Sequence, residues 1–465
     1  MCGILAIIQP NKSLNMMLEI YDGLTSLQHR GQDGFGVCCD DRTLRREGLV
    51  GDFKVKYFDS FDQPKHCFMG HVRYRTNGSS SKANLQPIVL EDKFRVSVVH
   101  NGNITNIDTL KDTYEYKNFF NGTYSIGTSD TYVLTVIFLK KLQSLMKVKL
   151  THDDVYFCCK YLLDICEGSF SLCILIEDYG LIVLRDNNGI RPLVFGKKGD
   201  SVMFASESCA LQHLDYKLTR SVSPGEIIIF PYTQLMSPLF YHNEKALLKP
   251  CLFEYIYFAR PDSIIDDISV YDSRFKMGRI LGNQIQKVLG DSIHKIDSIV
   301  PIPVSSMIFA LGVQDILKIP VHHGFVKNNY IPRTFIMENH EIIRQSVRKK
   351  LHIVECVFRN KNVLIIDDSI VRGNTSKHII KLANQCGVKS IVFCSAAPPI
   401  YYPNNYGIYI PTCEELIASN KSTEEIAQEL QVEKVIYNDL FEIVECLHDM
   451  NNKMIDCEKS MFMRD

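Results

Sequence analysis

The chain has 465 residues, of which 46% are hydrophobic and 23% are charged, and its net charge at pH 7 is -1. Domains usually contain about 100–200 residues, so we expect two or three of them. A net charge this close to zero gives no long-range attraction to nucleic acid or to a membrane surface, and we expect neither as a partner. No apolar run reaches the roughly 18 residues that a membrane-spanning helix needs.

The cysteine pattern argues against both zinc and disulfides. Sixteen cysteines are present, but none of them form a Cys-x-x-Cys motif. Adjacent pairs such as Cys38-Cys39 and Cys158-Cys159 fit neither a zinc knuckle nor a disulfide framework. We therefore expect most of them to be reduced, buried residues of a cytoplasmic protein.

The chain up to about residue 230 predicts antiparallel sheets. Residues 2–8 are apolar but lack the basic start and cleavage pattern of a signal peptide, so they predict a first strand that ends at Gln9-Pro10. Short apolar runs between Gly and Asn turns predict further strands at 70–74, 96–102, 172–176 and 225–229. We expect two helices here, one over residues 16–29 and one from Ser129-Asp130 to about residue 147.

From about residue 298 the pattern changes to strands that alternate with helices. Strands are expected at 297–301, 362–366 and 390–394, and helices at 306–318 and 375–386. This alternation predicts βαβ units and a parallel sheet. The polar stretch 233–250 is the best linker candidate, and the polar, Met-rich tail after about residue 448 is expected to be loosely held.

Cys2 is a candidate nucleophile because it follows the initiator methionine directly. Once Met1 is removed, the chain begins with a cysteine. A free α-amino group has a pKa of about 7.7–8.0 and a thiol about 8.5, so the amine can accept the thiol proton near neutral pH. Nucleophile and general base then lie within one residue. Taken alone, Cys2 would more often be an ordinary strand cysteine.

Other residues supply what cleavage of an amide through a thioester requires, namely an oxyanion hole and a clamp for the substrate. Asn101-Gly102 offers a side-chain amide and an unhindered backbone N–H at a strand end. Arg73 offers a fork for a carboxylate, and Asp130, at a helix start, offers an anion for an ammonium group. A lone Asn-Gly is usually a turn and a lone Arg usually a solvated side chain; it is the combination that favours a glutamine-type site.

The stretch 363–376 carries the second candidate site. An apolar strand ends in Asp367-Asp368, at the edge where open α/β sheets bind ligands. A turn rich in glycine and hydroxyl groups follows and leads into a helix, whose N-terminus can hold a phosphate. Two carboxylates suit a ribose diol or Mg²⁺. The alternative is an ordinary strand-to-helix loop with a capping aspartate; the required strand-loop-helix context favours the binding site over it.

Several motifs resemble known families. Residues 1–4, 27–33, 70–74, 100–103 and 129–131 resemble the class II glutamine amidotransferases of the N-terminal-nucleophile hydrolase branch. Residues 363–376 resemble the phosphoribosyl pyrophosphate motif of type I phosphoribosyltransferases. Residues 185–193, 205–208, 251–263 and 345–351 are similar to the amidophosphoribosyltransferase family. The resemblance covers nearly the whole chain, in the right order.

The resemblance implies a mixed fold, an α+β domain followed by an α/β domain. Residues 2–235 would form an αββα sandwich with glutaminase activity, residues 251–447 a parallel-sheet phosphoribosyltransferase domain, and residues 448–465 a tail. It implies the first committed step of purine synthesis: ammonia from glutamine is added to phosphoribosyl pyrophosphate, giving phosphoribosylamine. Implied partners are AMP or GMP as effectors and further copies of the chain in a dimer or tetramer.

The resemblance also implies roles for individual residues. Cys2 would be the nucleophile and its own amine the base, with Asn101 and Gly102 as the oxyanion hole. Glutamine would be held by Arg73 and Asp130, and Arg30 would either join that site or brace its loop. Residues assigned to phosphoribosyl pyrophosphate are Asp367, Asp368, Ser369, Val371, Arg372, Gly373, Asn374, Thr375, Lys327 and Arg333. One Mg²⁺ per subunit would lie near Asp367, Asp368 and Ser306.

Residues 324–351 carry six Lys and Arg residues, among them Lys327 and Arg333. A run of positive charge is usually a solvated surface and can indicate nucleic acid. Beside a pyrophosphate substrate, a lid that closes over the site and excludes water is the better interpretation. The apolar segment 253–258 is either plain core between the domains or also one wall of an ammonia passage, lined by Tyr257 and the lid residue Ile336.

The chain departs from the family pattern at several positions. One branch of the family holds a [4Fe–4S] cluster with four cysteines, but only Cys251 and Cys457 stand near the matching positions and 404–407 has no cysteine, so we predict no cluster. The sequence begins directly at the nucleophile, which suits the cluster-free branch. Val304, Pro332 and Tyr409 replace residues usual in relatives; these changes concern metal contact and lid closure rather than the reaction class.

Two other functions compete with this interpretation. The first is another class II amidotransferase. An asparagine synthetase would need an ATP-pyrophosphate loop, which the sequence does not show, and a glucosamine-phosphate synthase would need sugar isomerase domains, against which the Asp367-Asp368 motif argues. A nucleotide-sensing regulator could keep a phosphoribosyl fold, but it would leave Cys2 and its pocket unexplained. Measuring glutamate release from glutamine, with and without phosphoribosyl pyrophosphate, distinguishes these two alternatives from the function that the resemblance implies.

Overall fold

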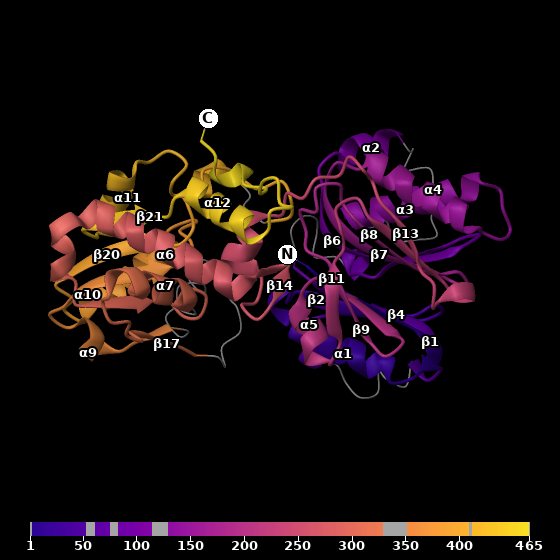
Figure 1. Ribbon diagram of the computed structural model, residues 1–465, viewed down its shortest axis with the longest axis horizontal. Coiled ribbons are helices and arrows are strands. Elements are labelled where there is room, and N and C mark those ends of the chain that lie inside the picture. The colour runs from indigo at the N-terminus through magenta and orange to yellow at the C-terminus, as the bar shows by residue number, and fades with distance from the viewer. Residues whose placement is uncertain are drawn as a thin grey trace.

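The computed structural model describes residues 2–52, 61–74, 82–113, 129–328, 351–408 and 412–464. In Figure 1 the N-terminal half, in indigo to magenta, lies beside the C-terminal half, in orange to yellow. No helix in these ranges is both long and apolar enough to cross a membrane.

Two stacked antiparallel sheets form the N-terminal half. The first has the strand order β11-β9-β10-β1-β4-β2-β3 and the second β13-β12-β8-β7-β6-β5. The first comprises β1 (Gly3–Ser13), β2 (Gly34–Cys38), β3 (Thr43–Glu47), β4 (Lys65–Arg73), β9 (Val194–Lys198), β10 (Ser201–Ala205) and β11 (Lys217–Ser221). The second comprises β5 (Ile88–Glu91), β6 (Arg95–Ile104), β7 (Gly168–Ile176), β8 (Gly180–Arg185), β12 (Ile227–Pro231) and β13 (Leu239–Tyr241).

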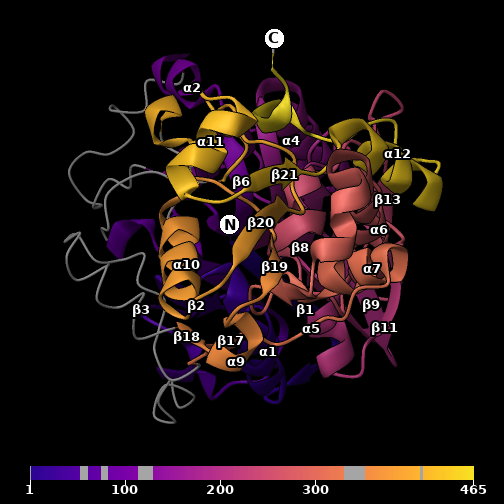
Figure 2. The same cartoon turned by 90° about the vertical axis from the view of Figure 1, so that its left-hand side faces the viewer.

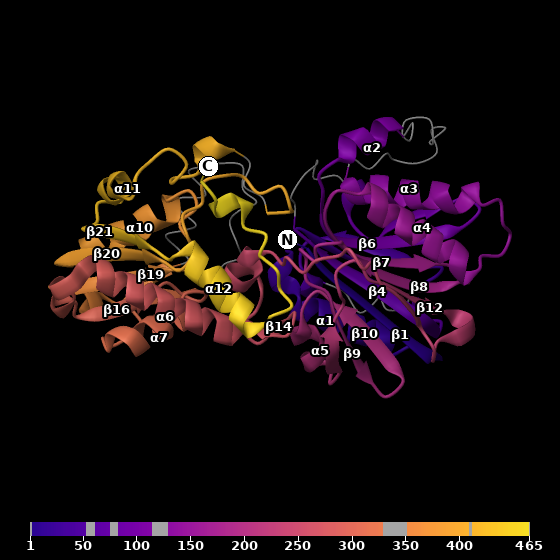
Figure 3. The same cartoon turned by 45° about the horizontal axis from the view of Figure 1, so that its top comes forward.

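Helices cover both outer faces of this pair of sheets (Figure 3). Helices α1 (Met16–Ser26) and α5 (Ser208–His213) pack on the first sheet, and α3 (Asp130–Ser144) and α4 (His152–Ile165) on the second, next to α2 (Ile107–Thr113). A separate apolar cluster that includes Ile4, Val99 and Phe204 fills the space between the sheets. The expected αββα sandwich is therefore confirmed.

Three details of the N-terminal half differ from the sequence-based expectation. Strand β1 does not end at Pro10 but continues past an irregularity to Ser13. Helix α4 was missed, although its capping box, Thr151 with Asp154, is a local start signal. Part of the predicted linker is strand β13, which pairs with β12 at the sheet edge.

The C-terminal half contains a parallel sheet with the order β16-β19-β20-β21. These strands are β16 (Ser298–Pro301), β19 (Asn362–Asp367), β20 (Ser390–Ser395) and β21 (Lys434–Tyr437). Figure 2 shows α10 (Asn374–Gln385) and α11 (Thr423–Leu430) on one side of it, and α6 (Val270–Leu289) and α7 (Met307–Leu317) on the other. The predicted parallel α/β architecture is confirmed.

Smaller elements complete this half. A short π-helix covers Glu254–Phe258, and the remaining elements are β14 (Ile264–Ile265), β15 (Ile268–Ser269), β17 (Phe325–Lys327), β18 (Leu351–Ile353), α9 (Glu355–Phe358) and α12 (Leu440–Met450). The expectation of a loosely held tail is wrong. Met454, Met461 and Phe462 are at most 3% exposed, because the tail packs back on the core and forms bridges at Leu248 and Cys251.

Candidate functional site

Four of the residues predicted for a glutamine site line one pocket of the N-terminal half. They are Cys2 just before β1, Arg73 at the end of β4, Gly102 on β6 and Asp130 at the start of α3. The antiparallel register pairs Gly3 with Val72, so the chain start lies directly beside the end of β4. Residues separated by up to about 130 positions are thus brought together by strand pairing.

Cys2 is only partly buried, and its thiol lies 3.6 Å from the carbonyl oxygen of Tyr74. Many other cysteines of the described chain are buried in apolar surroundings. Burial raises the pKa of the Cys67 and Cys159 thiols well above the usual value, which keeps them protonated and unreactive at neutral pH. Cys2 differs from these buried cysteines in its access to a polar pocket.

Asn101 and Gly102 lie on β6, next to β7. The Asn101 side chain is fully buried, and within the described ranges neither its nitrogen nor its oxygen has a hydrogen-bond partner. A buried amide without a partner is rare in proteins. Asn101 is adjacent in the chain to Gly102 but is not itself among the residues that line the Cys2 pocket. Gly102 has a φ of +152°, and a Cβ there would lie 2.0 Å from the carbonyl oxygen of Ser169, so only glycine fits.

Asp130 opens helix α3, behind the N-cap Ser129. Its carboxylate accepts hydrogen bonds from the backbone N–H groups of Thr131 at 2.7 Å and Ile104 at 3.2 Å. The ring of His100 lies 3.6 Å away, and burial lowers the pKa of His100, so the ring is neutral at pH 7. The Asp130 carboxylate and the Arg73 guanidinium both line the pocket.

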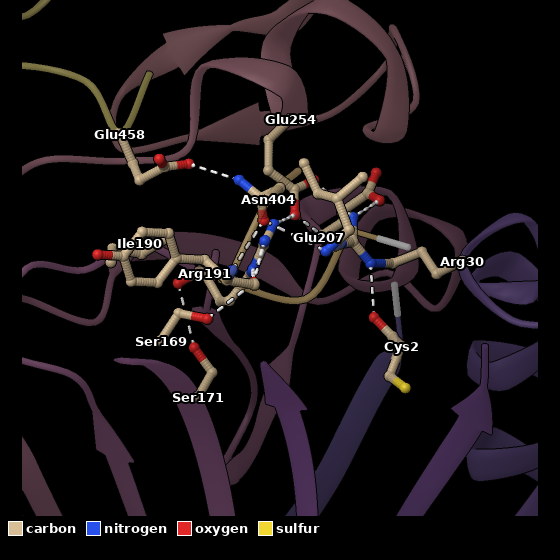
Figure 4. Close-up of polar contacts among 12 residues, drawn as sticks. Cys2, Arg30, Ser169, Ser171, Ile190, Arg191, Glu207, Glu254, Asn404 and Glu458 are labelled. Atoms are coloured by element: carbon tan, nitrogen blue, oxygen red, sulfur yellow. Dashed lines mark hydrogen bonds and ion pairs between the residues drawn. The ribbon is translucent and has the colours of Figure 1, made fainter. Parts of the chain in front are cut away.

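Arg30 lies behind the pocket. Its Nε donates to the carbonyl oxygen of Cys2 at 2.9 Å, and its other nitrogens pair with Glu207 at 2.5 Å and Glu254 at 2.7 Å (Figure 4). Although burial favours the neutral form, the two carboxylates hold the pKa of Arg30 above its usual value. Of the two expected roles, the geometry favours bracing, since Arg30 grips the backbone of Cys2.

Asp367 ends strand β19 at the carboxyl edge of the parallel sheet and Asp368 follows it directly; both are more than 90% buried. Burial, followed by the charge of Asp368, raises the pKa of Asp367 well above its usual value. Ser305 and Ser369 donate hydrogen bonds to Asp368, and the buried hydroxyl of Ser306 faces Asp367. Two crowded carboxylates with hydroxyl neighbours form a donor set that fits Mg²⁺ or a ribose diol.

The loop from Ser369 to Thr375 leads into helix α10. Gly373 has a φ of +74° and precedes the first residue of the helix, Asn374, so the helix N-terminus faces the loop. Val371 accepts a backbone hydrogen bond from Ile417 at 3.0 Å. Arg372 is half-exposed and paired with Glu415 at 2.6 Å. The loop is thus held by the segment 415–417, and it leads into a helix N-terminus, which is the context that favours phosphate binding.

The remaining predicted residues are more scattered. Lys327 ends β17 and pairs in register with Leu351 of β18. Tyr257 belongs to the π-helix and packs against Phe253 and Phe258, with ring centroids 5.7 and 5.4 Å away. Val304 is exposed. The predictions for Arg333 and Ile336 fall outside the described residues, as do Pro332, Tyr409 and most of the basic stretch 324–351.

The positions where relatives hold an iron–sulfur cluster carry other contacts here. Cys251 and Cys457 are buried, and Asn404 donates a hydrogen bond to Glu458 at 3.1 Å. In the described part of the chain, no three His, Cys, Asp or Glu side chains gather as a metal site.

Sequence reasoning missed a set of buried charges between the halves. Arg185 forms a paired contact with Asp266 at 2.7 and 2.9 Å, and Arg191 contacts Glu254 at 3.3 Å. Glu207 accepts from Arg30, from the backbone of Arg260 and from Ser263. The motifs 185–193 and 205–208 had suggested only a family resemblance. Both motifs contribute buried charged residues to this interface, which explains why charged residues stand at these positions.

The comparisons with known proteins agree with this geometry. The family described as "Glutamine amidotransferase domain" matches residues 71–213, which include most of the Cys2 pocket. The N-terminal half accordingly contains a glutamine amidotransferase domain.

Relatives over the full length define the family more closely. The chain is 40% identical to the amidophosphoribosyltransferase of Pseudomonas aeruginosa, over 96% of this chain and 89% of that one, and 40% identical to that of Escherichia coli, over 99% and 92%. A solved glutamine phosphoribosylpyrophosphate amidotransferase from B. subtilis, complexed with ADP and GMP, has a TM-score of 0.81 at 31% identity and covers 99% of this chain and 94% of that one. The chain belongs to the amidophosphoribosyltransferase family and is an enzyme.

Proposed function

We propose that the two halves of this chain divide the family's reaction between them. That reaction is the glutamine-dependent amination of phosphoribosyl pyrophosphate, the first step of purine biosynthesis. The N-terminal half releases ammonia from glutamine, and the C-terminal half uses it to displace pyrophosphate, giving 5-phospho-β-D-ribosylamine. We assign residues 2–235 and 251–447 to these two domains.

In the glutaminase half, the α-amine of Cys2 takes the thiol proton, and the thiolate attacks the side-chain amide carbon of glutamine. The oxyanion that forms is stabilised by the Asn101 amide and the Gly102 N–H. The α-ammonium group returns its proton to the departing nitrogen, so collapse of this intermediate releases ammonia and leaves a thioester, which water hydrolyses to glutamate and the free thiol. Arg73 and Asp130 bind the carboxylate and ammonium groups of the substrate and hold its amide next to Cys2.

In the C-terminal half, ammonia attacks C1 of the ribose and the pyrophosphate group leaves. Asp367 and Asp368 contact the ribose hydroxyls, and the 369–375 loop holds the 5-phosphate, with Lys327 and Arg333 contributing positive charge. Asp367, Asp368 and Ser306 would hold one Mg²⁺, which when bound neutralises charge on the pyrophosphate. Exclusion of water from this site favours ammonia over hydrolysis.

The single observation that carries the proposal is the convergence of Cys2, Arg73, Gly102 and Asp130 on one pocket. The test is glutamate release from glutamine with and without phosphoribosyl pyrophosphate, followed by detection of phosphoribosylamine. We expect both products. A response to ATP and aspartate would instead indicate an asparagine synthetase, and no turnover at all would indicate a regulator.

Further parts of the proposal rest on the family. We propose a cytoplasmic homo-oligomer, a dimer or tetramer, that is inhibited by purine monophosphates and holds no iron–sulfur cluster. The buried Cys251 and the Asn404–Glu458 contact support the last point. Iron and sulfide analysis of purified protein tests it: stoichiometric amounts of both would contradict the proposal.

A further inference from the structure

A loop of the C-terminal half, residues 404–408, packs directly behind the proposed oxyanion hole. Asn103 Nδ2 donates to the carbonyl oxygen of Asn405 at 2.8 Å, and Ser169 Oγ donates to that of Tyr406 at 2.9 Å. Asn103 and Ser169 are register partners on β6 and β7, one step from Gly102. The loop is therefore fixed to the two strands that carry the Gly102 peptide.

Gly407 makes the closest approach. A Cβ at this position would lie 3.3 Å from both the carbonyl carbon and the carbonyl oxygen of Gly102, and the φ of Gly407 is +101°. The backbone of one half thus rests on the backbone of the other, and a methyl group at this position would be both strained by the positive φ and tight against Gly102. A shift of this loop would press on the Gly102 carbonyl group, which belongs to the same residue as the N–H proposed to stabilise the oxyanion.

Arg191 latches the loop in place. Its Nε donates to the carbonyl oxygen of Tyr406 at 2.9 Å, its Nη2 also contacts this oxygen, and the side chain is fully buried (Figure 4). The backbone carbonyl of Arg191 accepts from Ser171 at 3.1 Å and from Arg185 at 2.8 Å, which fixes the latch to the sheet.

A second contact reaches the nucleophile. Arg191 Nη1 also contacts Glu254 at 3.3 Å, and Glu254 pairs with Arg30, which donates to the carbonyl oxygen of Cys2. Glu254 belongs to the π-helix; the carbonyl oxygens of Tyr255, within this helix, and of Ala259, directly after it, accept from Arg274 at 2.7 Å each. One wall of the glutamine pocket is therefore held from the C-terminal half at Gly102 and the other at Cys2.

The loop also has a backbone connection to the second site. The N–H groups of Ala396 and Ala397, at the end of β20, donate to the carbonyl oxygens of Asp367 and Asp368 at 2.9 and 2.8 Å. The chain then runs over ten residues to Gly407. The segment that packs behind the proposed oxyanion hole thus starts from residues that are hydrogen-bonded to the backbone of Asp367 and Asp368, the acids proposed to bind the ribose.

We infer that the glutamine pocket is completed by the C-terminal half: the 404–408 loop, latched by Arg191, positions the Gly102 peptide, and Glu254 positions Cys2 through Arg30. Gly407, Arg191 and Glu254 are positioning residues, since none of them lines the pocket. The inference deepens the proposed function and rests on its assignment of Gly102 as an oxyanion donor.

Gly407→Ala tests this directly, because its added methyl group presses on Gly102. Loss of an oxyanion donor typically slows turnover by 10²–10³-fold, so a displaced donor should lower kcat for glutamine by about tenfold or more. The KM for glutamine should stay within about threefold, since Arg73 and Asp130 are untouched. Ammonia-dependent synthesis should stay within about twofold.

The matched control is Gly387→Ala in the same half. Gly387 also has a positive φ, +73°, but a Cβ there meets nothing within 4 Å. Gly387→Ala introduces similar backbone strain but no new contact, so glutamine turnover and ammonia-dependent synthesis should both remain near normal. An unchanged kcat for glutamine in Gly407→Ala would overturn the inference, as would an equal loss in Gly387→Ala.

A second variant removes contacts without adding atoms. The double change Asn103→Ala and Ser169→Ala deletes two hydrogen bonds to the loop, and we expect a smaller fall of kcat for glutamine, about threefold to tenfold. Alkylation of Cys2 by iodoacetamide needs no oxyanion hole, so its rate should not change. Normal glutamine turnover in the double variant would overturn the inference. If Cys2→Ser kept glutamine turnover, the proposed function would fail instead.

Discussion

His71 offers a quantitative test of how the glutaminase half depends on pH. It lies in the middle of β4, paired in register with Ile4 on one side and Gly36 on the other, and is fully buried. Burial, and then the charge of Arg73, lowers its pKa to about 3. An unperturbed histidine titrates near 6.5, so the ring is neutral in the fold across a range in which the unfolded chain binds a proton.

The direction of the effect follows from proton linkage. Since the unfolded state binds more protons below pH 6.5, the free energy of unfolding falls as the pH drops from 6.5 towards the folded pKa of about 3. The slope is about 1.4 kcal/mol per pH unit for one proton. Between pH 7.5 and pH 5, His71 should thus cost the fold about 2 kcal/mol.

The measurement compares wild type with His71→Asn, a residue of similar shape that cannot titrate. Urea unfolding followed by circular dichroism at pH 7.5, 6 and 5 should show the difference between the two proteins change by about 2 kcal/mol in favour of the variant. His213→Asn, at an exposed position on α5, is the control and should show no such change. A difference that is independent of pH for His71→Asn would refute the reasoning.

Four further predictions concern activity. Cys2→Ser should abolish glutamine use but leave ammonia-dependent synthesis intact; equal loss of both in a folded variant, or a retained Met1 in the mass of active protein, would contradict the assignment. Asp367→Ala or Asp368→Ala should slow phosphoribosyl transfer by about 10–100-fold with either nitrogen donor while basal glutaminase survives, and unchanged ammonia-dependent turnover would refute the site. AMP or GMP should compete with phosphoribosyl pyrophosphate for the 369–375 loop. Inhibition that does not depend on the concentration of phosphoribosyl pyrophosphate would argue against competition. Tyr257→Ala should release more glutamate than phosphoribosylamine at saturating substrates, and a product ratio that stays at one would leave Tyr257 as core.

Local sequence signals predicted much of the fold. The strands at 96–102 and 362–366 and the helix at 375–386 are confirmed, because each is specified by its own apolar pattern and by flanking turn or capping residues. The four pocket residues of the glutamine site were also predicted from chemistry in short motifs. The structure adds only that they share one pocket.

What escaped prediction depends on contacts between distant positions. Asp266 lies 81 residues from Arg185, and nothing near either residue in the sequence indicates the pairing. The polar composition of the tail predicted that it is loosely held. Met461 and Phe462 are nevertheless buried, by packing against distant residues that no local sequence pattern indicates. Helix α4 is different, because its capping box, Thr151 with Asp154, is a local signal in the sequence that predicts a helix start.

The buried charges between the halves balance. Arg30 and Arg191 face Glu207 and Glu254, and all four side chains are at most 1% exposed. Buried ion pairs contribute little net stability compared with apolar residues of the same volume, whereas removal of one partner costs about 3–5 kcal/mol. A misplaced docking of the two halves would leave one of these charges buried without its partner. It would therefore lose more stability than the correct docking gains. The favoured docking is the one in which Arg30 also grips the carbonyl of Cys2, so the same charges that align the halves hold the nucleophile in position.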